Sequence, residues 1–132
     1  MYKIEIEPRI FHFKQPAGTS RGVYTERKSW LLTLTSDSMP GRKGVGECAP
    51  LPDLSCDATP EYEKTLNAVC ERFCQEGVIN YQMLRPYPSI LFGLETALLN
   101  LERGDILFDT PFSRGEEGIN INGLVWMGPY EE

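Results

Sequence analysis

The hydrophobic periodicity of this sequence changes near residue 50, and no other feature constrains the fold as much. Before that point, apolar residues such as Ile4 and Ile6 alternate with polar ones, which is the pattern of a strand with one buried face. After it, apolar residues recur every three or four positions, as they do in amphipathic helices. Strands that all precede the helices predict an α+β domain rather than the alternating order of a parallel sheet.

Three strands are expected in the first part of the chain. They cover residues 2–13, 27–36 and 45–48. Pro8 makes the first an edge strand or a bulged strand, because proline has no N–H to donate to a neighbour. Residues 14–26 are rich in glycine and small polar residues, and we expect them to form a long, mobile loop. This order predicts a three-stranded antiparallel meander.

Two helices follow the strands and predict a small helical bundle. Thr59-Pro60-Glu61 is a helix start, with threonine as the N-cap, proline in the first turn and glutamate near the positive end of the helix dipole. Gly77 would end this helix. The second helix follows Pro88 and would end at Gly104. It is apolar on nearly all sides, so we expect it to be the most buried.

The end of the sequence does not fit a small domain. Residues 105–118 form a polar loop, and residues 119–127 have the pattern of a strongly apolar strand. Such a strand normally needs cover on both faces, so we expect residues 1–118 to be one domain and residues 119–132 to begin another. An unpaired apolar strand is also a template for pairing with a second chain. We therefore expect self-association through residues 119–127.

Composition limits the location and the partners of the protein. Of its 132 residues 41% are apolar and 24% charged, and no apolar run approaches the ~18 residues of a membrane span. The N-terminus lacks the apolar core of a signal peptide, so we expect a cytoplasmic protein with no membrane partner. The net charge of −6 also argues against nucleic acid as a partner, because nucleic-acid-binding domains usually carry a basic patch.

The charge is unevenly distributed along the chain. Residues 1–50 hold 8 basic and 5 acidic side chains, whereas residues 51–132 hold 5 basic and 14 acidic ones. One interpretation is scatter among solvated side chains. The other is a basic surface within residues 14–28, formed by Lys14, Arg21, Arg27 and Lys28, with only Glu26 opposing them. Such a surface would attract an anionic small molecule, and the sequence leaves both interpretations open.

Few residues offer chemistry of their own. The four cysteines, Cys48, Cys56, Cys70 and Cys74, have no CxxC spacing, which disfavours a zinc site. Cys70 and Cys74 are four apart in an expected helix and share one face, so we expect them to be buried, reduced thiols. His12 is the only histidine and is expected to be structural, so a nucleophilic triad finds no support. Gly44-x-Gly46 matches a loose dinucleotide fingerprint, but no helix opens there. Glu95 is expected to make a structural hydrogen bond or to point to the helix edge.

Three segments carry recognisable motifs, namely GECAPLPDLS at 46–55, PSILFGLE at 88–95 and INGLV at 121–125. The first is similar to the GE-x-x-PLP-x-x-S segment of o-succinylbenzoate synthases. The second is similar to their PS-x-x-FG-x-E helix start, and the third to the first strand of their catalytic barrel. In this order the segments resemble the N-terminal capping domain of the enolase superfamily, in its muconate-lactonizing subgroup.

The resemblance implies that the catalytic and metal-binding residues lie on later barrel strands. This chain would then be truncated just after the first barrel strand, hold no catalytic residue, bind no metal and be inactive alone. In the complete enzyme a lysine would remove a proton next to a carboxylate, and Mg²⁺ would stabilise the enediolate. Loss of hydroxide by syn-elimination would then give o-succinylbenzoate for menaquinone biosynthesis.

The resemblance also implies a lid role for two segments of this chain. The basic stretch at 14–28 and the proline-rich stretch at 49–55 would close over the barrel mouth and exclude water from an anionic substrate. The residues implied to face the substrate are Ser20, Arg21, Pro50, Leu51 and Asn122. Ser20 and Arg21 would contact it from the basic loop, Pro50 and Leu51 would form an apolar wall, and Asn122 would lie at the rim.

Two other functions remain open at this stage. One is the lid of a related N-succinylamino-acid racemase or dipeptide epimerase. The other is a stand-alone, non-catalytic binding module without a barrel. A reading frame that continues into a Lys-x-Lys motif would favour an enzyme, whereas a stop codon after Glu132 would favour the module.

Overall fold

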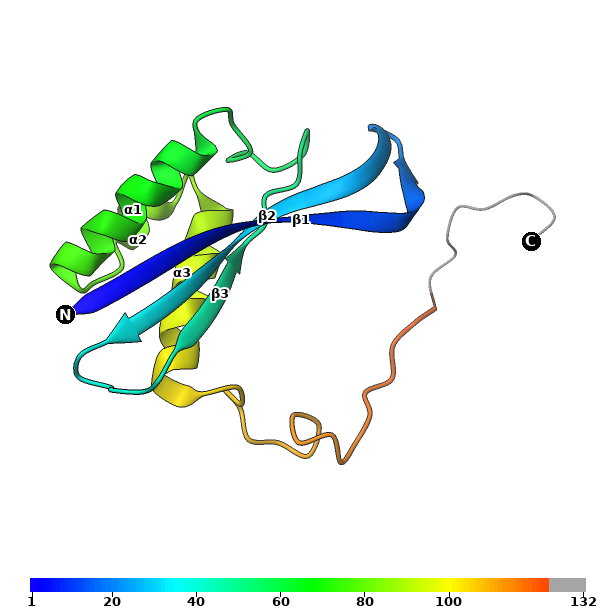
Figure 1. Ribbon diagram of the computed structural model, residues 1–132. Helices are drawn as coiled ribbons and strands as arrows, with labels where there is room; N and C mark the ends of the chain where they lie inside the picture. The colour runs from blue at the N-terminus through cyan, green and yellow to red at the C-terminus, as the bar shows by residue number, and fades with distance from the viewer. Residues whose placement is uncertain (124–132) are drawn as a thin grey trace.

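The computed structural model describes residues 1–123 and shows an antiparallel sheet followed by helices (Figure 1). The elements are β1 (Tyr2–Thr19), β2 (Gly22–Ser36), β3 (Gly44–Cys48), α1 (Tyr62–Glu76), α2 (Tyr81–Leu84) and α3 (Pro88–Arg103). The strand order is β1-β2-β3, and both pairs of neighbours are antiparallel. The predicted α+β class, with a three-stranded meander before the helices, is confirmed.

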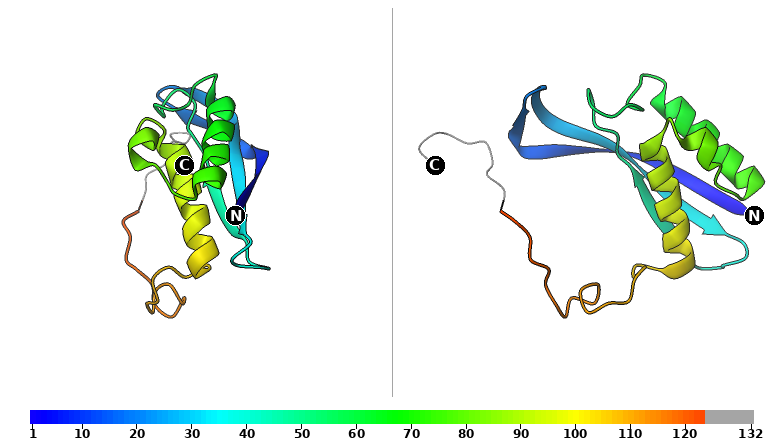
Figure 2. Two further views of the ribbon diagram at one scale, coloured as in Figure 1. Left: turned by 90° about the vertical axis from the view of Figure 1, so that its left-hand side faces the viewer. Right: turned by 180° about the vertical axis from the view of Figure 1, so that it is seen from behind.

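The core lies between one face of the sheet and the helices, which all cover that face (Figure 2). On β2, Trp30, Leu32 and Leu34 are buried, while the positions between them are half-buried, as the alternation predicts. The helices contribute Leu66, Phe73, Ile90, Leu94 and Leu101 to the same core. The expectation that the second helix is buried holds for one side only, because Phe92 on α3 is 65% exposed.

Glycines bring α3 and β3 into unusually close contact. A Cβ atom on Gly46 would collide with the carbonyl oxygen of Gly93, and a Cβ on Gly44 would collide with that of Ala97. In the opposite direction, a Cβ on Gly93 would meet the Cys48 sulfur. The two backbones therefore pack directly on each other, which only residues without side chains permit.

The loop expected at residues 14–26 is instead the end of a long β-hairpin, and that prediction was wrong. β1 and β2 stay paired up to Thr19 and Gly22, with a break in register between His12 and Ala17. Thr19 closes the turn, since its hydroxyl accepts from the Arg21 amide at 3.2 Å and donates to the Gly22 carbonyl at 3.1 Å. The hairpin projects past the helices (Figure 1).

For the strand that contains Pro8, the sequence predicted either an edge strand or a bulge, and the first alternative is correct. β1 is the edge strand, which is where a sheet tolerates proline, because one side of the strand has no neighbour. The pairing of Pro8 with Trp30 is in continuous register, however, and the irregularity lies beyond His12 rather than at the proline.

The C-terminal ends of the helices were predicted better than their N-terminal starts. Gly77, with φ of +71°, ends α1, and Gly104 ends α3, as predicted. The first helix begins at Tyr62 with no side-chain cap, so the expected Thr59 cap is wrong; residues 59–61 form a turn instead. The linker holds the short helix α2, which the sequence analysis missed and which Asn80 caps by accepting from Met83 N.

The segment after α3 forms no helix or strand as far as residue 123. The strand predicted at 119–127 is therefore absent over residues 119–123, where Ile119 and Ile121 are exposed, and the rest of it lies outside the described residues. The division at residue 118 stays a prediction. Within residues 1–123, no helix is long and apolar enough to cross a membrane.

Replacing Gly46 with alanine tests the close packing of β3 on α3. The new methyl group would push the two backbones apart, and we expect the free energy of unfolding to fall by about 1–3 kcal/mol or more. Gly118→Ala is the matched control, because no atom lies within 4 Å of its added Cβ. Urea unfolding measures both variants, and equal stability of the two would contradict the packing described above.

Self-association through residues 119–127 remains a prediction, and deletion tests it. Removing residues 119–132 should shift the chain towards monomer in sedimentation velocity, because the apolar side chains available for pairing with another chain are lost. A full chain that is already monomeric at tens of micromolar would show that this segment does not associate.

Candidate functional site

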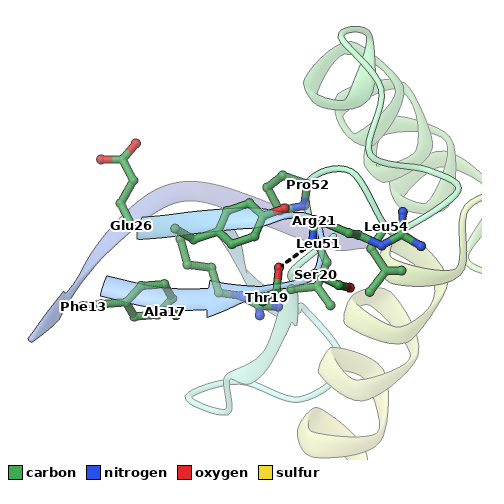
Figure 3. A pocket seen from close by; sticks show the side chains of 11 residues that line it. Phe13, Ala17, Thr19, Ser20, Arg21, Glu26, Leu51, Pro52 and Leu54 are labelled. Atoms are coloured by element: carbon green, nitrogen blue, oxygen red, sulfur yellow. Dashed lines mark hydrogen bonds between the residues drawn. The ribbon is translucent and has the colours of Figure 1, made fainter. Parts of the chain in front are cut away.

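A cavity of about 440 Å³ lies between the end of the hairpin and the loop that follows β3 (Figure 3). We call residues 17–24 the hairpin tip and residues 49–55 the proline loop. The lining residues are Phe13, Ala17, Thr19, Ser20, Arg21, Tyr24, Glu26, Arg27, Leu51, Pro52 and Leu54. The cavity therefore has one wall from each of two segments that are about 30 residues apart in the sequence.

The cavity combines an apolar wall with two guanidinium groups. Phe13, Leu51 and Leu54 supply apolar surface, and Arg21 and Arg27 supply positive charge, opposed by Glu26 alone among the lining residues. Each guanidinium carries five N–H donors, so the hydrogen bonds that these arginines make within the protein leave donors for a ligand. Such a lining suits a ligand with an apolar body and a carboxylate.

Three of the five predicted site residues line the cavity. Ser20 and Arg21 come from the hairpin tip, and Leu51 comes from the proline loop (Figure 3). Pro50 is buried beside Leu51 and is not among the lining residues. Asn122 lies in the irregular segment after α3, where it is exposed and its Nδ2 donates to Gly123 O at 3.1 Å, so the structure does not bring it to the cavity.

The predicted basic surface is divided by contacts within the protein. Arg27 Nη2 donates to Ala49 O at 2.8 Å, and Arg21 Nη1 donates to Asp53 O at 3.0 Å, so both arginines hold the proline loop. The Nζ of Lys28 instead lies 3.5 Å from Glu63 Oε2, with which it forms an ion pair, and 4.7 Å from the centre of the Trp30 ring. Lys14 is exposed and does not line the cavity.

Just beyond the proline loop, a buried carboxylate holds the chain to the first turn of α3. Asp57 is 1% exposed, and its Oδ2 accepts from Ser89 N at 2.9 Å and from Ser89 Oγ at 2.6 Å. Because Ser89 Oγ donates to Asp57, it accepts from Tyr62 Oη, 2.6 Å away. Burial is the main cause that raises the pKa of Tyr62, so this phenol stays protonated and donates.

The expectation of buried thiols in the first helix holds for Cys70 but not for Cys74, which is only half-buried. Burial raises the pKa of Cys48 and of Cys70 to about 12, so both thiols are neutral at ordinary pH, whereas Cys56 is exposed. His12 is exposed, and its Nδ1 lies 3.8 Å from Glu26 Oε2. As predicted, Glu95 makes a structural hydrogen bond, accepting from Tyr81 Oη at 3.0 Å. Within residues 1–123, no three His, Cys, Asp or Glu side chains are grouped to hold a metal ion.

Replacing Asp57 tests how the chain after the proline loop is anchored. Asp57→Ala would leave Ser89 N and Ser89 Oγ without their shared acceptor in a buried place, and we expect a loss of about 2–4 kcal/mol in the free energy of unfolding. Asp57→Asn keeps an acceptor oxygen and should lose less. Chemical denaturation measures both, and an alanine variant as stable as the parent chain would contradict this role.

The fold and the sequence together define the class of protein. A three-stranded antiparallel meander followed by helices on one of its faces matches capping-domain structures of the enolase superfamily. Residues 11–101 match the family described as "MenC, N-terminal domain". The chain belongs to this family.

Two comparisons with proteins of Desulfotalea psychrophila agree with that assignment. The chain is 32% identical to its o-succinylbenzoate synthase over 149 aligned residues, which cover 88% of this chain and 40% of that protein. The crystal structure of MenC from the same organism superposes with a TM-score of 0.61 and 25% identity over 95% of this chain and 42% of the other. The chain thus spans about two fifths of the length of these relatives.

A further solved structure has the same fold. The o-succinylbenzoate synthase of Thermosynechococcus elongatus, complexed with magnesium in its active site, is 23% identical and superposes with a TM-score of 0.51. The similarity covers 82% of this chain and 31% of that enzyme. The part of these proteins that this chain matches is the capping domain.

Proposed function

We propose that this chain is the lid of an o-succinylbenzoate synthase, which forms o-succinylbenzoate by syn-elimination of water in menaquinone biosynthesis. The observation that carries the proposal is the cavity between the hairpin tip and the proline loop, where two arginines face an apolar wall. An anionic substrate with a carbon ring suits that lining, because guanidinium groups bind carboxylates and apolar side chains bind the ring.

In this proposal the residues of the cap bind and enclose the substrate. Arg21 donates to a substrate carboxylate from the hairpin tip, and Ser20 contacts the substrate beside it. Leu51 contributes the apolar wall, with Pro50 packed behind it. Asn122 is assigned to the rim by resemblance alone. Closure of the two segments over the barrel mouth keeps water from the reaction.

The remainder of the enzyme supplies the chemistry. The described residues do not fit a magnesium site, since no three suitable ligands are grouped among them. We therefore assign the metal and the lysine base to the barrel domain of the complete protein, and this chain alone should be inactive. The proposal includes a cytoplasmic location, which suits the four free cysteines.

A chimera tests the proposed function. Residues 1–118 replace the matching segment of the Desulfotalea enzyme, and product is measured as o-succinylbenzoate by chromatography. We expect the chimera to form product and the 132-residue chain alone to form none. A folded chimera that instead epimerises N-succinylamino acids or dipeptides would assign the lid to a related enzyme. A folded chimera without either activity would contradict an enzymatic lid.

Two arginine variants of that chimera test the assigned binding residue. Arg21→Met removes a guanidinium that lines the cavity, and we expect KM to rise about tenfold or more because a charge-assisted hydrogen bond is lost. Arg9→Met is the control, because Arg9 is exposed on β1, pairs with Glu7 and does not line the cavity. Equal KM values for the two variants would remove Arg21 from the proposed site.

A further inference from the structure

Asp53 occupies a position in the proline loop that favours glycine. The amides of Leu54 and Ser55 both donate to Leu51 O, at 3.3 and 2.9 Å, so the loop turns sharply with Pro52 second and Asp53 third. Within residues 1–123, Asp53 is the only non-glycine residue with positive φ, at +61°. A turn of this kind usually has glycine or asparagine in the third position, so the aspartate is strained.

Two contacts from the hairpin tip reach this strained residue. Tyr24 Oη donates to the Asp53 carboxylate at 3.2 Å, and Arg21 Nη1 donates to the Asp53 carbonyl at 3.0 Å. Glycine would keep the second contact and lose the first. Turn geometry alone therefore does not explain an aspartate here, whereas its bond to Tyr24 does.

The hairpin tip needs such an anchor. Its pairs, from Ala17 with Tyr24 to Thr19 with Gly22, are separated from the rest of the β1–β2 ladder by the break in register after His12. The tip also lies beyond the helices that cover the sheet (Figure 1). Nothing in the core therefore fixes its distance from the proline loop.

We propose that Asp53 is a latch that holds the hairpin tip against the proline loop and thereby keeps the wall of the cavity in place. Asp53 is a positioning residue, because it acts through Tyr24 and does not line the cavity itself. Partial burial, followed by the hydrogen bond to Asp53 and its negative charge, raises the pKa of Tyr24, so the phenol keeps the proton that the latch requires. This inference concerns how the lid is held and is independent of the reaction assigned above.

Hydrogen–deuterium exchange of the 132-residue chain, read by mass spectrometry on peptides within residues 13–25, tests the latch. Asp53→Gly relieves the backbone strain and removes the carboxylate, and Tyr24→Phe removes only the hydroxyl. We expect each variant to speed exchange at the tip about three- to tenfold, since one solvent-exposed hydrogen bond is lost. The double variant should exchange no faster than either single variant, because both remove the same bond.

Two further variants complete the experiment. Asp53→Asn keeps an acceptor oxygen and should lie between the parent chain and Asp53→Gly. Glu63→Gln breaks the Lys28–Glu63 pair, which also joins β2 to another segment but not at the tip, and should leave tip exchange unchanged. Peptides from the β2–β3 ladder report whether each variant stays folded. Unchanged tip exchange in folded Asp53→Gly and Tyr24→Phe, or additive effects in the double variant, would overturn the latch.

Discussion

The packing of α3 on β3 determines the position of the elements around the cavity. Glycines at 44, 46 and 93 let the two backbones approach more closely than side chains would allow. β3 leads directly into the proline loop, and α3 receives Asp57, two residues beyond that loop, at its first turn. The proline loop is thus held at both ends by the same pair of elements. Any change in the spacing of α3 and β3 would move one wall of the cavity.

Sequence reasoning predicted the parts of the fold that depend on burial. The alternation along β2 and the apolar stripes of α1 and α3 reflect contact with one core. The glycines that end both helices were recognisable for another reason, since glycine readily adopts the positive φ found there. Sequence reasoning failed for residues 14–26, where the strands continue without cover. There the hairpin is held by backbone pairing and by Thr19, and neither leaves an alternating pattern. The four residues of α2 are too few to show a helical period.

Only part of the site could be predicted from the sequence, and that part came from family resemblance rather than from hydrophobic patterning. Resemblance to a known family led to Ser20, Arg21 and Leu51, and the structure brings these three to one cavity. Tyr24 and Asp57 were missed because their partners lie 29 and 32 residues away, a separation at which local patterns carry no information. The Pro-Asp pair in the proline loop was a local signal for a turn and could have drawn attention to Asp53.

The hairpin carries its half of the cavity outside the helical layer. The sequence there can therefore change for ligand binding without having to maintain the buried core. Residues of the tip contribute little to the buried core, so substitutions there change the cavity wall at small cost to folding. The backbone of the proline loop has less freedom, because Asp57, two residues beyond it, ties the chain to α3. Over evolutionary time the tip is therefore the place where ligand preference can diverge with the least effect on the position of the opposite wall.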